Sequence, residues 1–401
     1  MGLGAKASAA PGADSQPGDR SRHAVERLSL TDFRNYQRLS QDFTPAPVVL
    51  TGANGTGKTN LLEAVSMLAA GQGLRRVAYG DLTRAGGAVW SVFARICSAR
   101  GDMVEIGTGL DPASPGKSAR LVRVDRVPQS GTGVLADLVE MVWLTPTMDG
   151  LFTGPAGDRR RFLDRLILCF DPSYRTRVGQ FERAMRQRNR LLETTSGGDA
   201  LFTSIETVMA ETGVAIAAAR AEAVAQLAAT IARRCAQRPD SPFPWATMSL
   251  EGRLERELAE RPAVEVEDVY LGLLAAGRPR DRAAGRTLDG PHRSDLLVGH
   301  GPKGMPARVC STGEQKALLV GLVMAHAELI RQSRDGVTPI LLLDEIAAHL
   351  DELRRAALFE ELKVLGTQAW MTGTDRSQFA ALEGHAQFFT TGDSTLRAQP
   401  D

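Results

Sequence analysis

The 401-residue sequence lacks several features that mark other classes of protein. Its four cysteines (97, 169, 235 and 310) form no C-x-x-C pair, which argues against a zinc hook or ribbon and fits a reduced, cytoplasmic setting. No run of eighteen apolar residues occurs, so we expect no membrane span. Residues 1–22 lack the apolar core of a secretory signal, and the formal net charge of +1 gives no overall basic signal.

The glycine-rich segment at residues 52–59 is the most informative part of the chain. It matches G-x-x-x-x-G-K-[ST], a pattern whose backbone N–H groups converge on phosphate oxygens. A strand-like apolar run at 48–51 precedes it and a helical pattern at 60–68 follows, as a phosphate loop requires. Lys58 is expected to reach the β- and γ-phosphates of ATP, and the Thr59 hydroxyl to bind Mg²⁺. The predicted ATP-binding residues are Gly52, Ala53, Asn54, Gly55, Thr56, Gly57, Lys58 and Thr59.

A second motif ends in the acids Asp344 and Glu345. The apolar run at 339–343 before them is typical of a buried parallel strand, and ligands sit at the carboxyl ends of such strands. Asp344 is expected to bind ATP-linked Mg²⁺, and Glu345 to accept a proton from the attacking water as a catalytic base. The alternative is that the two acids only cap the following helix. The phosphate loop in the same chain favours the catalytic interpretation.

A third motif begins at Ser311 and Gly313, just before a helical pattern at 314–331. Ser311 could be a simple N-cap, although a helix N-terminus also suits an anion. In ATP-binding-cassette (ABC) ATPases such a signature segment caps the γ-phosphate held by the partner subunit, and this segment resembles it. Residues 347–351 resemble the D-loop of that superfamily. Ser311 follows Lys58 by 253 residues, which indicates an inserted lobe.

The patterns predict an α/β fold, an ABC-type P-loop ATPase head with a mixed sheet and flanking helices plus a mostly helical second lobe. Helices are expected at 175–192, in the alanine-rich stretch 200–236 and at 266–276, without the sustained heptads of a long coiled coil. A hairpin is expected from 89–96 and 103–106. We assign 25–165 and 285–395 to the head, 166–284 to the lobe, and 1–24 and 396–401 to tails, the first of them disordered.

Four further segments resemble the RecF family, and with the nucleotide motifs they extend the similarity over about 25–395. They are residues 28–36, 154–164, 186–192 and the turn Gly290, Pro291, His292 and Arg293. The resemblance implies a weak DNA-dependent ATPase of recombinational and gap repair. ATP would drive head dimerisation and DNA clamping, slow hydrolysis would reset the dimer, and RecO and RecR partners would help load the RecA recombinase. Ser294, Asp295 and Glu314 depart from the family pattern.

Arginines are concentrated in two regions. Residues 158–190 hold ten arginines against four acids, and a second group lies at 278–293. Clustered arginines suit DNA phosphates, although a solvated helix face, a bracing role or a compositional bias would give the same pattern. The predicted DNA contacts are Arg159, Arg160, Arg186, Arg188 and Arg293. Two alternatives remain for the whole chain: a nucleotide-gated DNA scaffold with negligible turnover, and a transporter-type or other non-repair ABC ATPase.

Overall fold

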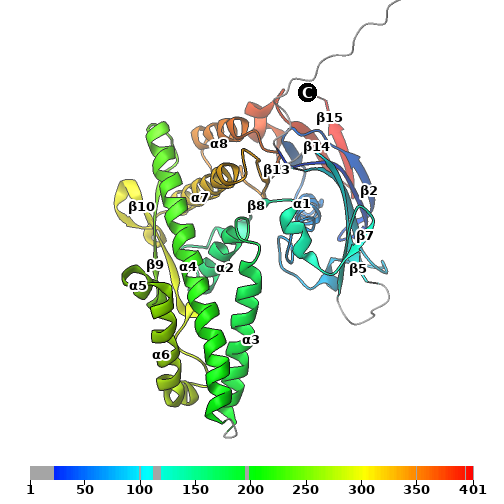
Figure 1. The fold of residues 1–401 in the computed structure, drawn as a ribbon. Helices are drawn as coiled ribbons and strands as arrows, with labels where there is room; N and C mark the ends of the chain where they lie inside the picture. Colours follow the sequence, from blue (N-terminus) through cyan, green and yellow to red (C-terminus); the bar gives the residue numbers. More distant parts are fainter. Residues whose placement is uncertain are drawn as a thin grey trace, which may run out of the picture.

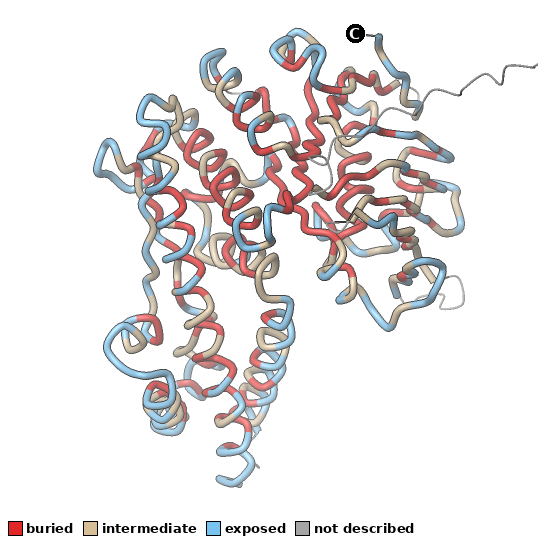
Figure 2. The backbone as a smooth tube through the Cα atoms, turned by 45° about the horizontal axis from the view of Figure 1, so that its top comes forward, coloured by how far each residue is buried: buried red, intermediate tan, exposed pale blue. Residues whose placement is uncertain are grey.

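The computed structural model of the chain describes residues 22–98, 101–111, 119–194, 198–348, 350–392 and 394–400. It confirms the predicted α/β head with a mostly helical lobe (Figure 1). Two six-stranded sheets form the described part of the head, and a three-stranded sheet lies beside the lobe helices. Figure 2 shows buried backbone through the centre of the molecule and exposed backbone at the outer turns and the far ends of the lobe helices.

The central sheet of the head has the strand order β15-β14-β3-β13-β12-β8, and all neighbours are parallel except β14 and β15. Its middle strands are buried at every residue, because their short apolar runs are covered on both faces. The strands are β3 (Val48–Thr51), β8 (Met141–Leu144), β12 (Ile340–Leu343), β13 (Ala369–Thr372), β14 (Gln387–Gly392) and β15 (Thr395–Gln399). The predicted phosphate loop and acids therefore share one sheet edge.

A second, antiparallel sheet has the order β2-β1-β4-β5-β6-β7. It confirms the predicted hairpin as β4 and β5, but this hairpin lies in its own sheet and not in the central one. The alternating burial of β4 explains this, since only one face of the sheet meets the core. The strands are β1 (Ala24–Phe33), β2 (Tyr36–Asp42), β4 (Ser91–Cys97), β5 (Met103–Leu110), β6 (Arg120–Val124) and β7 (Val127–Gln129). Leu61 and Leu62 of α1 (Lys58–Ser66) share one buried cluster with strands of both sheets.

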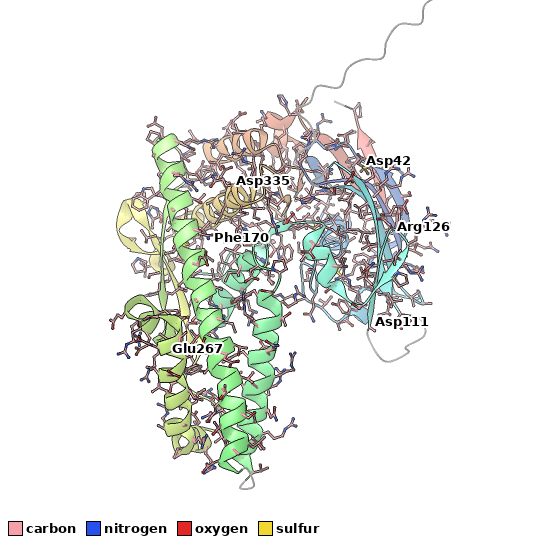
Figure 3. The ribbon with its side chains drawn as sticks, viewed as in Figure 1. Asp42, Asp111, Arg126, Phe170, Glu267 and Asp335 are labelled. Atoms are coloured by element: carbon pink, nitrogen blue, oxygen red, sulfur yellow. The ribbon has the colours of Figure 1, made fainter. Side chains whose placement is uncertain are left out.

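The other face of the central sheet packs against helices and against the lobe in a second cluster. These helices are α2 (Ala156–Ile167), α7 (Thr312–Ser333) and α8 (Glu352–Leu365). The aromatic ring of Phe170, labelled in Figure 3 near the middle of the molecule, meets His326 of α7 at 5.2 Å between ring centroids. The lobe thus joins the head through a continuous core.

The lobe confirms the three predicted helices and adds a fourth. They are α3 (Tyr174–Glu193), α4 (Asp199–Gln237), α5 (Arg253–Glu260) and α6 (Ala263–Ala284). A small sheet of β9 (Ala246–Glu251), β10 (Asp295–His300) and β11 (Met305–Pro306) was not predicted, and it joins the lobe to the segment before α7. By length and composition alone α4 could cross a membrane, but half of its most apolar window is buried, and it packs on α3, α6 and α7 as a core helix does.

The predicted bounds of the two tails are wrong, because the tail residues next to the head belong to the fold. Ala24 begins β1, and Arg22 forms a bridge with Thr338, so residues 22–24 belong to the fold. Residues 396–399 belong to β15, which pairs with the edge of β14. Their polar composition suggested a tail, but an edge strand needs only one covered side. Residues 1–21 and 401 lie outside the described part of the chain.

Candidate functional site

The phosphate loop runs from β3 to α1 with a left-handed backbone at three glycines. Gly52, Gly55 and Gly57 have φ values of 140°, 83° and 107°, which L-residues with side chains rarely adopt. At Gly57 a β-carbon would also lie 2.5 Å from the Asn35 Nδ2 atom. The backbone conformation of the loop therefore favours glycine at these three positions.

Lys58 lies within the loop and is almost fully buried. Its Nζ donates to the carbonyl oxygens of Gly52 at 2.6 Å and Ala53 at 2.8 Å. Burial lowers the pKa of Lys58, and the nearby Glu345 and Asp344 oppose that shift. The ammonium group thus sits between the loop and the acids, where it could exchange these carbonyls for phosphate oxygens.

The two predicted Mg²⁺ ligands meet in the structure. Thr59 Oγ1 donates to Asp344 Oδ1 at 2.9 Å, and Asp344 is 3% exposed. A hydroxyl beside a buried carboxylate fits Mg²⁺, which takes oxygen ligands and keeps several positions for waters and phosphates.

Thr372, at the end of β13, connects the two acids, a role that the sequence did not reveal. Its hydroxyl donates to Asp344 Oδ1 at 2.7 Å and accepts from the Glu345 backbone N–H at 2.7 Å. Glu345 is exposed and has φ 50°, an uncommon conformation for a residue with a side chain. β13 lies between β3 and β12, so Thr372 fixes Glu345 at the edge shared with the phosphate loop.

The turn between β1 and β2 braces the phosphate loop, which is the second role missed from the sequence. Asn35 Nδ2 donates to the Thr56 carbonyl at 3.3 Å, and the Tyr36 hydroxyl donates to the Gly57 carbonyl at 3.2 Å. Asn60 of α1 donates to Asn35 Oδ1 at 2.8 Å. The sequence marked this turn only through the family resemblance, because nothing local pairs it with a loop twenty residues away.

The signature segment begins α7 with a capping box. The Glu314 N–H donates to Ser311 Oγ at 3.4 Å, and the Ser311 N–H donates to Glu314 Oε2 at 3.0 Å. Lys303 pairs with Glu314 and, together with the bonds to Ser311, lowers the pKa of Glu314 to about 2. The unusual Glu314 is therefore engaged in the cap. Ser311 is exposed, and a β-carbon at Gly313 would meet no atom within 4 Å.

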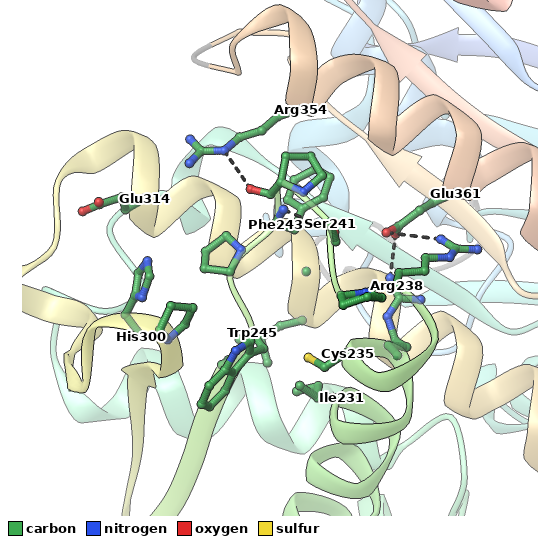
Figure 4. Close-up of a pocket in the computed structure, with 18 of the residues that line it drawn as sticks. Ile231, Cys235, Arg238, Ser241, Phe243, Trp245, His300, Glu314, Arg354 and Glu361 are labelled. Carbon is green, nitrogen blue, oxygen red and sulfur yellow. Dashed lines mark hydrogen bonds and ion pairs between the residues drawn. The ribbon is translucent and has the colours of Figure 1, made fainter.

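The described hydrogen bonds of Ser311 are to residues at the start of α7, and none of them reaches residues 52–59. Figure 4 shows Glu314 beside a cavity of about 590 Å³, together with His300, Trp245 and Arg354. None of the residues that line this cavity belongs to the phosphate loop. The cavity beside Glu314 is therefore distinct from the phosphate loop.

Arg188, predicted to contact DNA, is fully buried, so that prediction is wrong. Its guanidinium donates to Glu206 at 2.9 Å, Asp281 at 2.7 Å, Thr287 at 2.9 Å and the Leu274 carbonyl at 2.7 Å. The sequence shows only an arginine in a basic helix, and the helix turns this position toward α4 and α6.

The other predicted DNA contacts differ in their surroundings. Arg159 forms a two-pronged ion pair with Asp295 at 2.8 and 2.7 Å, and Arg160 donates to the Ser294 carbonyl at 2.7 Å. Asp295, one of the departures from the family pattern, is therefore the ion-pair partner of Arg159. Arg186 and Arg293 are exposed, so the structure leaves both available to a ligand.

The fold and the site define an ABC-type P-loop ATPase head of the kind found in SMC proteins. Residues 24–395 match the family model described as the RecF/RecN/SMC N terminal domain. The "DNA replication and repair protein RecF" of Mesorhizobium japonicum is 55% identical over 379 residues, 94% of this chain and 98% of the relative. The same-named protein of Brucella abortus is 53% identical over 379 residues, 94% of this chain and 96% of the relative. This chain belongs to the RecF family.

Solved structures support the same fold. One titled "Structure of the recombination mediator protein RecF-ATPrS in RecFOR pathway" has a TM-score of 0.83 at 21% identity and covers 95% of this chain and 100% of its own. An Smc head domain from Pyrococcus furiosus has a TM-score of 0.53 at 15% identity, over 94% of this chain and 96% of its own. At these identities the likeness concerns the fold.

Proposed function

We propose that this protein is an ATP-gated DNA-binding protein of recombinational and gap repair. The contact between Thr59 and Asp344, beside the buried Lys58, supports the proposed binding of ATP. It brings together residues suited to phosphate and Mg²⁺ from distant segments of the chain. Bound Mg²⁺ would neutralise phosphate charge and polarise the γ-phosphate. Residues 52–59 would hold the phosphates, while Thr59 and Asp344 would hold the ion.

The exposure of the signature segment supports dimerisation as part of this proposal. Ser311 is exposed and a β-carbon at Gly313 would meet no atom within 4 Å, so a partner could reach the capped start of α7. A helix N-terminus attracts anions. Two heads would enclose two ATP molecules, each held by the phosphate loop of one chain and Ser311 of the other.

Hydrolysis would reopen the dimer. Glu345 is held by its backbone to Thr372 and is exposed, so its carboxylate could accept a proton from a water that attacks the γ-phosphate. A weak DNA-dependent ATPase suits a device in which binding closes the clamp and slow turnover resets it. The alternative is a nucleotide-gated scaffold in which turnover is negligible.

The repair role is extended to this chain from its family. The curated relatives are named DNA replication and repair proteins, and the solved relative is titled a recombination mediator of the RecFOR pathway. We propose that the dimer binds gapped or junction DNA in the cytoplasm and helps load the RecA recombinase together with RecO and RecR partners.

The test measures mass by light scattering and DNA binding by fluorescence anisotropy, each with and without ATP. We expect Glu345→Gln to form a stable dimer with ATP and to bind DNA tightly, whereas Lys58→Ala should stay monomeric and bind weakly. A wild-type monomer that binds DNA equally well without ATP would refute the clamp. If Glu345→Gln supports repair in cells as well as wild type and Lys58→Ala does not, the scaffold is favoured over the turnover model.

A further inference from the structure

Arginines from several segments converge where the head meets the lobe. They are Arg75 and Arg76 after α1, Arg120 of β6, Arg161 and Arg165 of α2, and Arg175 of α3. We call Arg75, Arg76, Arg161 and Arg175, which are the exposed members, the junction arginines. None of these was among the DNA contacts predicted from the sequence.

Contacts around Gly71 place Arg175, which belongs to the lobe, against the head. The Arg175 guanidinium lies over Gly71, where a β-carbon would be 3.2 Å from its Nη2 atom. Arg120 Nη1 donates to the Gly71 carbonyl at 2.6 Å from the other sheet. Arg165 and Arg175 also line one small cavity of about 150 Å³ with Ala69 and Ala70. Three elements thus bring cationic side chains to one surface.

The positive charge of this surface is poorly neutralised. Within the described ranges no carboxylate forms an ion pair with Arg76 or Arg175. Arg161 pairs with Asp158, and Arg75 shares the buried Glu63 with Arg34. The surface therefore holds more guanidinium than carboxylate groups.

The electrostatics of Arg76 and Arg165 agree with the geometry around Gly71. Burial lowers the pKa of Arg76, and repulsion from Arg161 and Arg175 lowers it further, while Asp164 opposes the shift. Burial also lowers the pKa of Arg165 to about 10, with Arg76 as the next cause. Like charges held together by rigid elements cost free energy, and a bound polyanion would relieve that cost.

Hydrogen bonds connect this surface to the nucleotide site. Arg75 Nη1 donates to Asn60 Oδ1 at 3.0 Å, and Asn60 Nδ2 donates to Asn35 Oδ1 at 2.8 Å. Asn35 in turn bonds to the Thr56 carbonyl in the phosphate loop at 3.3 Å. A ligand that moves Arg75 would therefore act on a brace of the ATP site.

We propose that the junction arginines form a binding surface for the DNA phosphate backbone, linked to the nucleotide site through Asn60 and Asn35. The inference rests on the proposed function and names the surface at which DNA would bind. Guanidinium forks suit phosphate oxygens, and several such groups on different elements suit a repeating polyanion better than a single phosphate. Because the surface spans head and lobe, bound DNA would contact both.

The test is the double variant R76A/R175A, which removes the two junction arginines without an ion-pair partner. Its control is R183A/R190A, which removes two exposed arginines farther along α3. Affinity for a fluorescent DNA duplex would be measured with ATP over a series of salt concentrations. We expect R76A/R175A to bind roughly tenfold more weakly and to reduce the slope of log K against log salt by about two, as for two lost phosphate contacts. The control should keep the wild-type slope.

ATP affinity, measured by calorimetry, should be unchanged in R76A/R175A, because the described side-chain hydrogen bonds of residues 52–59 involve neither arginine. If wild type binds DNA in an ATP-dependent way and R76A/R175A keeps the same affinity and slope, the surface is wrong while the proposed function stands. An equal loss in R183A/R190A would also overturn the assignment. Wild type that fails to bind DNA with ATP would instead refute the proposed function itself.

Discussion

Replacement of Arg188 by Met should destabilise the lobe and leave the affinity for DNA unchanged. The guanidinium is fully buried and bonds to Glu206, Asp281, Thr287 and the Leu274 carbonyl. Methionine fills much of the same space but supplies no donors, so two buried carboxylates would lose a cationic partner.

The size of the expected loss in stability depends on the partners that Glu206 and Asp281 keep. Removing one member of a buried ion pair costs about 3–5 kcal/mol, because the other charge stays buried. Arg278 still bonds to Glu206 at 2.6 Å, and the Leu288 N–H still bonds to Asp281 at 3.2 Å. These partners place the expected loss for Arg188→Met near the low end of that range, at about 3 kcal/mol.

The free energy of unfolding would be measured by urea titration with circular dichroism. Arg186→Met is the matched control on the same helix: its side chain is 63% exposed and 3.6 Å from Glu182, so its loss should stay below about 0.5 kcal/mol. The reasoning is refuted if Arg188→Met keeps wild-type stability but loses DNA affinity, since Arg188 would then be a DNA contact as first predicted.

Three further predictions concern the nucleotide site and the signature. Lys58→Ala should bind ATP roughly a hundredfold more weakly by calorimetry, since hydrogen bonds to charged groups contribute about 1.5–3 kcal/mol each; unchanged affinity would contradict its role. Thr372→Val should slow ATP hydrolysis on the order of tenfold with little change in ATP affinity, because Asp344 and the Glu345 backbone lose their shared hydroxyl; a loss confined to affinity would contradict this. The bond to Lys303 lowers the pKa of Glu314 from its ordinary value of 4.5 to about 2, so the stabilising effect of Glu314 is present above pH 4.5 and is lost as pH falls toward 2. The stability difference between wild type and Glu314→Gln, measured by urea unfolding, should therefore shrink over that interval, and a constant difference would count against the ion pair.

The parts of the site predicted from sequence are those whose chemistry lies in one continuous segment. The phosphate loop needs its glycines for a left-handed backbone, and the two acids follow an apolar run that is typical of a buried strand. Thr372 could not be found in this way. Its role depends on β13 lying between β3 and β12, which is a matter of strand order and has no local signal.

The arginines show the limit of composition as a guide. Arg186 and Arg188 stand two positions apart in one basic helix, yet one is exposed and the other buried among acids from α4 and α6. Side chains two positions apart on a helix point in different directions, but the spacing does not show which of them faces another element. The polar segment at 396–399 was likewise predicted as a tail, because pairing with β14 involves backbone groups and little side-chain signal.

The most direct test of the two-chain site mixes two inactive proteins. Lys58→Ala lacks a working phosphate loop, and Ser311→Arg blocks the signature; each alone should show no ATPase activity. If Ser311 acts on the partner's ATP, an equal mixture should regain ATPase activity, because each mixed dimer holds one intact site. No recovery in a mixture that demonstrably forms mixed dimers would contradict the account.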